Sequence, residues 1–146
     1  MSKKRSVSVS RLIDAPANVI FDVLADPARH AEIDGSGTVQ AAQESMPERL
    51  KMGSKFGMKM KIVLPYDMRS TVVEFEEDAR IAWAHFGKHR WRYELEAIDG
   101  GTMVTETFDW STSRAPLFIE MMGYPKKHVP SMQKTLERLE AVATAG

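Results

Sequence analysis

The sequence predicts an α+β domain in which a curled antiparallel sheet of six or seven strands is covered by a long C-terminal helix. Two observations support this prediction. Residues 38–110 contain successive alternating apolar and polar runs with short turn sequences between them, which is typical of an antiparallel meander. The last apolar stripe with helical spacing begins near Ser131, and it is the one predicted element long enough to cover the apolar face of such a sheet.

The composition is that of one ordinary globular domain spanning residues 1–146, with 43% hydrophobic and 27% charged residues. Twenty basic and twenty acidic side chains give a formal net charge of zero, so we expect no nucleic-acid partner. The absence of cysteine excludes a disulfide framework and a thiolate metal site. We expect a cytoplasmic location, because the basic start lacks the apolar core of a signal peptide. We also expect no stable membrane insertion, because no apolar run approaches the ~20 residues of a membrane span.

The first elements are a strand and one or two short helices. Residues 6–14 alternate and predict the strand. Asp14-Ala15-Pro16 then predicts a helix start with Asp14 as the N-cap, and Asp26-Pro27 ends that helix. Residues 28–33 predict a short further helix before the Asp34-Gly35-Ser36-Gly37 loop.

Three strand candidates follow this loop. Residues 38–45 carry a weak strand pattern. Residues 55–64 carry a stronger one, with Phe56, Met58 and Met60 on one face, and Pro65-Tyr66-Asp67 is expected to break it. Residues 68–76 then predict the next strand.

Two three-residue turns, at residues 77–79 and 86–88, are predicted to continue the meander. The first turn sets a register that pairs three residues before it with three after it: Phe75 with Ile81, Val73 with Trp83, and Thr71 with His85. The second turn pairs His85 with His89 and Trp83 with Trp91. All the residues in these pairs then share one inner face of the sheet.

The clearest hairpin signal lies at residues 89–110, around Asp99-Gly100, which favours a two-residue type I′ turn. This turn fixes which residues face each other on the inner side: Leu95 with Val104, Tyr93 with Glu106, Trp91 with Phe108, and His89 with Trp110. Arg90, Arg92 and Glu94 fall on the other side, as expected for a solvated face.

The C-terminal region predicts a short helix at residues 117–122 and a longer one that ends near Ala143. Gly123-Tyr124-Pro125 is expected to interrupt the helical pattern, and Pro130 to block a regular helix through residues 126–129. We therefore expect the long helix to be kinked or split into two parts.

Glu106 is the residue that the sequence most clearly indicates as functional, because it is a lone carboxylate on an otherwise aromatic and apolar face. It could be a general acid or base, with a pKa raised by the apolar surroundings and with Tyr93 as its hydrogen-bond partner. The alternative is a structural carboxylate that is tied to Tyr93 or His89, or that reaches solvent at the mouth of a cavity.

Further candidates could line an internal cavity together with Glu106. They are aromatic, histidine or methionine residues predicted on the inner face or at the break before the last helix: Met58, Met60, Trp83, His85, His89, Trp91, Phe108, Trp110, Tyr124 and His128. Methionine lines adaptable apolar surfaces, but the same residues could also be simple core. Since His85, His89 and Glu106 lack the spacing of a known metal site, we expect no metal and no cofactor.

Two segments resemble a known superfamily. Residues 9–16, Val-Ser-Arg-Leu-Ile-Asp-Ala-Pro, followed by residues 19–27, Val-Ile-Phe-Asp-Val-Leu-Ala-Asp-Pro, are similar to the opening of START-like (SRPBCC, Bet v 1-like) proteins. Residues 99–111 resemble the penultimate hairpin of the bacterial polyketide cyclase/dehydrase-like branch. The resemblance implies a helix-grip fold with a deep cavity between sheet and helix. Pro125 and Pro130 depart from the smooth helix of that pattern.

Members of this superfamily bind lipids, sterols, polyketides or plant hormones, and the fold does not decide among these roles. The resemblance implies a hydrophobic, lipid-like or polyketide-like ligand. A cyclisation or dehydration step would use Glu106 and Tyr93 to move protons. The alternatives are a non-catalytic ligand carrier or sensor and a co-chaperone-like protein-interaction module. A homodimer is our default hypothesis, because dimers are the commonest soluble oligomers.

Overall fold

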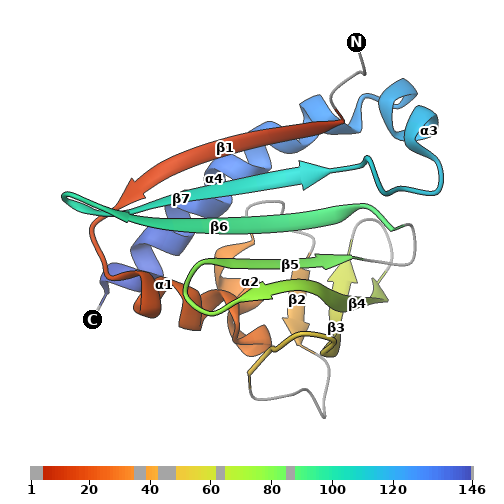
Figure 1. Ribbon diagram of the computed structural model, residues 1–146. Helices are drawn as coiled ribbons and strands as arrows, with labels where there is room; N and C mark the ends of the chain where they lie inside the picture. Colours follow the sequence, from red (N-terminus) through yellow and green to blue (C-terminus); the bar gives the residue numbers. More distant parts are fainter. Residues whose placement is uncertain (1–4, 35–38, 43–48, 62–64, 85–87, 146) are drawn as a thin grey trace.

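A seven-stranded antiparallel sheet curls around one long helix in the computed structural model (Figure 1). The structure describes residues 5–34, 39–42, 49–61, 65–84 and 88–145, and for residues 28, 31, 39–42, 57–61 and 65–69 it describes the backbone alone. The strands are β1 (Ser6–Ile13), β2 (Val39–Ala42), β3 (Lys55–Lys61), β4 (Pro65–Glu76), β5 (Arg80–Ala84), β6 (Arg90–Ile98) and β7 (Gly101–Asp109). The helices are α1 (Ala17–Leu24), the 3₁₀ turn η1 (Pro27–Arg29), α2 (His30–Ile33), α3 (Pro116–Met121) and α4 (Tyr124–Thr144). The predicted α+β helix-grip architecture is confirmed.

The strand order is β1-β7-β6-β5-β4-β3-β2, so the first strand of the chain lies beside the last one. Strands β2 to β7 form the expected meander, and α1, η1 and α2 occupy the connection from β1 to β2. Helix α4 packs against β1 and β7 and also contacts α1 and α2. The core therefore lies between the concave face of the sheet and α4 (Figure 1).

The β6–β7 hairpin has the predicted register, with Tyr93 opposite Glu106 and Ile98 opposite Gly101. The type I′ assignment is wrong, because Asp99 does not adopt the positive φ that this turn requires at both central positions. The positive φ values belong instead to Gly100 (90°) and Gly101 (140°). A Cβ atom at Gly101 would lie 2.1 Å from the carbonyl oxygen of Ile13, so glycine lets β1 approach the hairpin closely.

The β4–β5 hairpin departs from the predicted register beyond its first pairs. Phe75 faces Ile81 as expected, but a β-bulge between Val72 and Glu74 places Val72 opposite Trp83. The predicted pair of Val73 with Trp83 is therefore wrong, because a bulge sets two residues against one and shifts everything beyond it. The same shift overturns the predicted pair of Thr71 with His85, since Thr71 faces Ala84. The pair of Trp83 with Trp91 in β5 and β6 is confirmed.

Two predicted boundaries of secondary-structure elements are wrong. Residues 65–67 do not break the sheet, because β4 begins at Pro65, a position where proline is tolerated in a strand. Asp14 does not cap α1, because Pro16 occupies the N-cap position and no side chain makes a capping hydrogen bond. The predicted partner of His89, His85, lies outside the described residues.

Helix α4 is continuous over 21 residues, so of the two expected alternatives, a kinked helix or one split into two parts, the split is wrong. The predicted interruption at Gly123-Tyr124-Pro125 is confirmed at Gly123, which adopts a left-handed φ of 73° between α3 and α4, whereas Tyr124 and Pro125 already belong to α4. Pro125 lies in the first turn, where its missing N–H has no intrahelical partner. Pro130 removes one helical hydrogen bond at a cost of about 3 kcal/mol, which the burial of the apolar stripe on α4 offsets. The buried residues of that stripe are Met132, Leu136 and Leu139.

Polar contacts at two points anchor α4. The guanidinium of Arg11 in β1 donates to the carboxylate of Glu140, with Nη2 2.9 Å from Oε1. The guanidinium of Arg138 donates to the backbone carbonyl of Asp34 at the end of α2. Asp34 is thereby held close to the inner side of the sheet. Within the described part of the chain, no helix is both long and apolar enough to cross a membrane.

Candidate functional site

Glu106 lies in the middle of the concave face, on β7, between Val9 of β1 and Tyr93 of β6. Alternation along β7 turns its side chain inward, between those of Val104 and Phe108. Only 3% of Glu106 and 5% of Tyr93 is exposed. The sequence therefore predicted correctly both the direction of the Glu106 side chain and its cross-strand neighbour.

The hydroxyl of Tyr93 donates a hydrogen bond to the Glu106 carboxylate. Burial removes water from the charged form and raises the pKa of Glu106 to about 8, against the smaller lowering effect of the Tyr93 hydrogen bond. Burial and the nearby Glu106 charge also raise the pKa of Tyr93. The Oε1 atom of Glu106 is buried and has no hydrogen-bond partner. At neutral pH the pair is therefore mostly uncharged, and one carboxyl oxygen of Glu106 has no hydrogen-bond partner.

A second carboxylate, Asp34, acts on this pair through its charge. Asp34 follows the last residue of α2, and its negative charge raises the pKa of both Glu106 and Tyr93. The sequence predicts Asp34 only as the first residue of a loop, because nothing in the local pattern indicates that residue 34 lies near residue 106. The packing of α2 against α4 brings them together.

The buried apolar side chains form two separate groups, and the Glu106–Tyr93 pair lies where they meet. The larger group includes Val104, Leu136 and Leu139, and the smaller group contains Phe108, Trp110, Ile119 and Met132. Val9 and Trp91 contact both groups. A polar pair therefore interrupts the core at its centre, where uniform apolar packing would be the expected arrangement.

Aromatic and histidine rings surround Phe108 at one end of the sheet. The rings of His89 and His128 stack on Phe108 with centroid distances of 5.5 and 4.7 Å, and Trp91 meets it edge-on at 4.8 Å. Trp110 lies 5.6 Å from Phe108, just beyond the end of β7. The structure thus brings together five of the predicted cavity-lining residues, from β6, β7, α4 and the segments next to them.

Burial disfavours the charged form of the histidines in this cluster. Burial lowers the pKa of His89, and burial together with the nearby His89 lowers the pKa of His128. Tyr124 joins the cluster through its ring, 6.1 Å from that of His128. Among the residues that the structure describes, no three histidine, aspartate or glutamate side chains are grouped as metal ligands would be.

Trp83 lies in a second aromatic group that includes a histidine missed by sequence reasoning. The ring of His30 stacks on Trp83 at 4.9 Å and meets Phe56 edge-on at 5.5 Å. Its Nε2 donates to the carbonyl of Leu24 at 2.9 Å, and burial lowers the pKa of the ring. No sequence pattern marks His30, because its surroundings come from three different elements.

Three of the predicted cavity-lining residues fall on parts of the chain that the structure does not describe in full. His85 and the side chains of Met58 and Met60 lie outside what the structure describes, although the backbone of β3 pairs Met58 with Met68 and Met60 with Tyr66. An internal cavity between sheet and helix therefore stays a prediction, as does a solid core.

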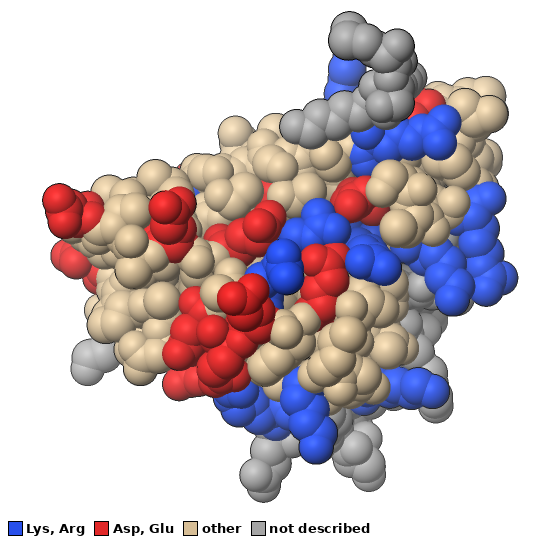
Figure 2. Space-filling model, in the orientation of Figure 1, with Lys and Arg blue, Asp and Glu red and all other residues tan. Residues whose placement is uncertain are grey.

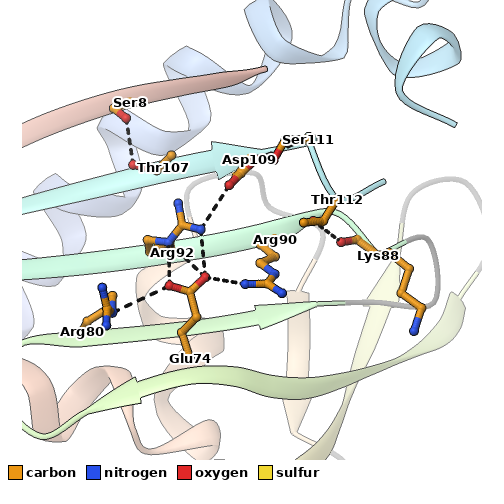
Figure 3. Close-up of polar contacts among 10 residues, drawn as sticks. All are labelled: Ser8, Glu74, Arg80, Lys88, Arg90, Arg92, Thr107, Asp109, Ser111 and Thr112. Atoms are coloured by element: carbon orange, nitrogen blue, oxygen red, sulfur yellow. Dashed lines mark hydrogen bonds and ion pairs between the residues drawn. The ribbon is translucent and has the colours of Figure 1, made fainter. Parts of the chain in front are cut away.

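The outer face of the sheet carries an ion-pair network instead of simply solvated charges (Figure 3). The carboxylate of Glu74 accepts from Arg92 and Arg90, in each case at 2.8 Å, and Arg80 lies 3.7 Å away. Arg92 also donates to Asp109 at 3.1 Å. The Arg92 hydrogen bond holds the pKa of Glu74 below its usual range. Next to the network is a hollow of about 330 Å³, which is lined by Glu76, Ala79, Arg80, Glu94, Leu95, Glu96, Met103 and Thr105.

Comparison with known families gives a clear assignment. Residues 4–144 match the family described as polyketide cyclase / dehydrase and lipid transport. The chain belongs to this family. An uncharacterised protein of Mycobacterium tuberculosis is 41% identical over 139 residues, which are 91% of this chain and 62% of that protein. The chain therefore spans about three fifths of the length of this relative.

Solved structures agree with this family assignment at the level of the fold. A crystal structure of a protein from Nitrosomonas europaea has a TM-score of 0.76 at 14% identity and covers 99% of this chain and 97% of its own. An AHSA1-like protein from Aeromonas hydrophila has a TM-score of 0.66 at 20% identity, with 96% and 92% covered. The predicted resemblance to START-like proteins of the polyketide cyclase/dehydrase-like branch is confirmed.

Proposed function

We propose that this member of the polyketide cyclase / dehydrase and lipid transport family binds a hydrophobic small molecule, lipid-like or polyketide-like, between the sheet and α4. The observation that carries the proposal is the unpartnered Oε1 of Glu106 at the meeting point of the two apolar groups. A buried polar atom without a partner costs about 1–3 kcal/mol, so it favours any ligand that supplies the missing hydrogen bond. Apolar walls with one polar contact are typical of small-molecule sites.

The polar group of such a ligand is a neutral oxygen. Because Glu106 is mostly protonated at neutral pH, it can donate a hydrogen bond to a carbonyl or hydroxyl oxygen. A carboxylate would meet the negative charge of Asp34 in a low-dielectric region, which disfavours anionic ligands. The ligand class that fits is therefore an apolar molecule with a ketone or hydroxyl group.

Catalysis is a second candidate function, favoured by the pKa of about 8 at Glu106. Near this pH both protonation states are populated, as a general acid and base requires. In a dehydration, the carboxylate would take the proton next to the ligand carbonyl and return it to the departing hydroxyl, which leaves as water. Tyr93 would hold the carboxyl group in place throughout. The non-catalytic alternative is a ligand carrier, in which the same pair only anchors the ligand.

Native mass spectrometry of freshly purified protein tests the binding proposal. We expect a co-purified apolar molecule, and we expect Glu106→Gln to change its occupancy or identity. Glu94→Gln is the matched control, because Glu94 is an exposed carboxylate on the outer face of β6. A protein that is always empty and that fails to bind an uncharged apolar fluorescent probe with a ketone or hydroxyl group would overturn the proposal.

Turnover of the identified ligand then separates enzyme from carrier. If Glu106 moves protons, Glu106→Gln abolishes turnover but leaves a measurable ligand affinity. Equal turnover in wild type and variant would remove the catalytic role. Circular dichroism of both proteins establishes that the comparison is made between folded chains.

A further inference from the structure

Helix α3 turns an apolar face to solvent. Leu117 is 69% exposed, Phe118 51%, Met121 78% and Met122 41%, so four large apolar side chains stand out from a helix of six residues and its C-cap. On a helix, residues 117 and 121 share one face, and so do residues 118 and 122. Scattered exposed apolar residues are ordinary, but a contiguous group of this kind marks an interaction site.

The other side of α3 is fixed to the protein, so this exposure is not the result of a loose segment. Ile119 is buried against Phe108, Trp110 and Met132. The carboxylate of Glu120 accepts hydrogen bonds from the indole of Trp110 at 2.9 Å and from Arg5 at 3.2 Å. The only acidic side chain of α3 is therefore turned inward and paired.

Basic side chains flank this apolar face. Arg114 is exposed just before α3, and Lys126 and Lys127 are exposed in the first turn of α4 just after it. The ammonium of Lys127 lies 5.5 Å from the centre of the Tyr124 ring, and Phe118 lies 6.4 Å from the same ring. A further exposed basic residue, Lys88, lies close to the segment that precedes α3. Its backbone carbonyl accepts a hydrogen bond from the hydroxyl of Thr112 at 2.7 Å (Figure 3).

Charge is unevenly distributed over the face shown in Figure 2, although the chain is neutral as a whole. In Figure 2 blue basic side chains lie along the right-hand edge, just below the position of α3 in Figure 1, and also in the centre and at the lower edge, whereas most red acidic side chains lie in the left half and the centre. The exposed Glu94, Glu96 and Asp99 lie on the β6–β7 hairpin toward the opposite end. Such a charge distribution orients a protein near a charged surface, with the basic end toward negative charge.

We propose that the α3 end of the molecule docks on an anionic lipid surface. The side chains of Leu117, Phe118 and Met121 enter the boundary between headgroups and acyl chains, and Arg114, Lys126 and Lys127 contact the acidic headgroups. An apolar face bordered by Lys and Arg is the arrangement by which peripheral proteins lie on anionic membranes. The docking is peripheral and involves no membrane-spanning element.

Vesicle co-sedimentation tests this proposal with the whole chain. We expect binding to vesicles that contain phosphatidylglycerol and at least about ten-fold weaker binding to pure phosphatidylcholine, because each basic residue at an anionic surface adds about 1 kcal/mol. Binding should fall as salt rises, since exposed charges are screened over about 10 Å at 0.1 M ionic strength.

Three variants sharpen the test. Leu117→Ser/Met121→Ser and Lys126→Glu/Lys127→Glu should each weaken binding to phosphatidylglycerol vesicles by about ten-fold or more. Leu12→Ser/Ile98→Ser is the matched control, because these residues are 43% and 41% exposed and lie toward the other end of the molecule. This control should bind as the wild type does. All changed side chains are exposed, and circular dichroism checks that each variant is folded.

Several results would overturn the proposal. They are absence of binding to anionic vesicles, equal loss in the Leu12/Ile98 control, or a wild-type dimer that Leu117→Ser/Met121→Ser dissociates, which would make a second copy the occupant of this face. Docking is independent of the proposed function, and Glu106→Gln should bind vesicles as the wild type does. A failed vesicle test therefore leaves ligand binding untouched, and an empty protein leaves docking untouched.

Discussion

Tyr93 and Glu106 face each other across β6 and β7, and the tyrosine hydroxyl donates a hydrogen bond to the carboxyl group in the centre of the core. Both groups are buried, so ionising Glu106 is costly even though the hydrogen bond from Tyr93 partly favours its charged form. This arrangement costs stability when the carboxyl group is charged and little when it is protonated. Its energetic consequences can be measured whether or not a ligand is known.

Glu106 should make the wild-type protein less stable as pH rises. Its folded pKa of about 8 lies above the ordinary value of 4.5 for a glutamate, so the folded state holds the proton that the unfolded state releases. The favourable contribution is complete below the unfolded pKa and is lost as pH rises through the folded pKa. The loss is on the order of 5 kcal/mol.

Urea unfolding of wild type and Glu106→Gln at pH 5, 7 and 9 measures this effect. We expect the variant to become the more stable protein by pH 9 and the two to be close at pH 5. Parallel pH profiles would contradict the assigned burial of the carboxyl group.

Tyr93→Phe should raise the pKa of Glu106 further, because the lost hydrogen bond had favoured the charged form. The variant should also lose about 1–2 kcal/mol of stability, since a buried carboxyl oxygen is left without its donor. Carbon-13 NMR titration of the Glu106 side chain measures the pKa shift. Tyr124→Phe, outside this pair, is the control and should leave the titration unchanged.

Gly101→Ala should destabilise the protein by at least about 2 kcal/mol, because the added Cβ meets the Ile13 carbonyl oxygen and the φ of 140° is strained for alanine. Gly53→Ala is the matched control. Gly53 also has a positive φ, 82°, but nothing lies within 4 Å of the added atom. It should therefore cost only about 1 kcal/mol. Equal costs in thermal unfolding would show that the contact with β1 has no role.

Pro130→Ala should stabilise the protein by about 1–3 kcal/mol, because it restores a hydrogen bond in the second turn of a continuous helix. Pro125→Ala should change stability by less than about 1 kcal/mol, because Pro125 occupies the first turn. Denaturant midpoints of the two variants make this comparison. A destabilised Pro130→Ala protein would indicate that the proline is required at that position.

Glu74→Gln should destabilise the protein by about 1–3 kcal/mol, because it removes the shared partner of Arg90 and Arg92 on the outer face. Since the folded pKa of Glu74 is depressed, its contribution is present above the unfolded pKa and is lost as pH falls through the folded value. The difference between wild type and variant should therefore shrink in acid. Glu96→Gln, an exposed neighbour of the network, is the control and should have little effect.

The β6–β7 hairpin was predictable because its information is local. Alternation and the Asp99-Gly100 turn signal set the register, and that register placed Glu106 opposite Tyr93 without knowledge of any other element. The β4–β5 hairpin was predictable only up to its bulge. Val72 and Val73 are identical in type, so the sequence carries no signal for which of them faces the core.

The part of the site that sequence reasoning missed depends on contacts distant in sequence. Asp34 influences Glu106 because α2 packs on α4, and His30 stacks on Trp83 because α2 lies over the sheet. The continuity of α4 through Pro130 is also a tertiary effect, since the local cost of a proline is outweighed by burial of Leu136 and Leu139.

The pairing of β1 with β7 has a consequence for synthesis of the chain. Val9 lies opposite Glu106, 97 positions later, so β1 must wait for nearly the whole sheet to leave the ribosome before its partner exists. Pairings over such distances form slowly because a long loop has to close first. During that wait β1 presents an unpaired strand edge, which is the kind of segment that chaperones protect. Closure of the sheet, and with it burial of Glu106, is therefore a late event in folding.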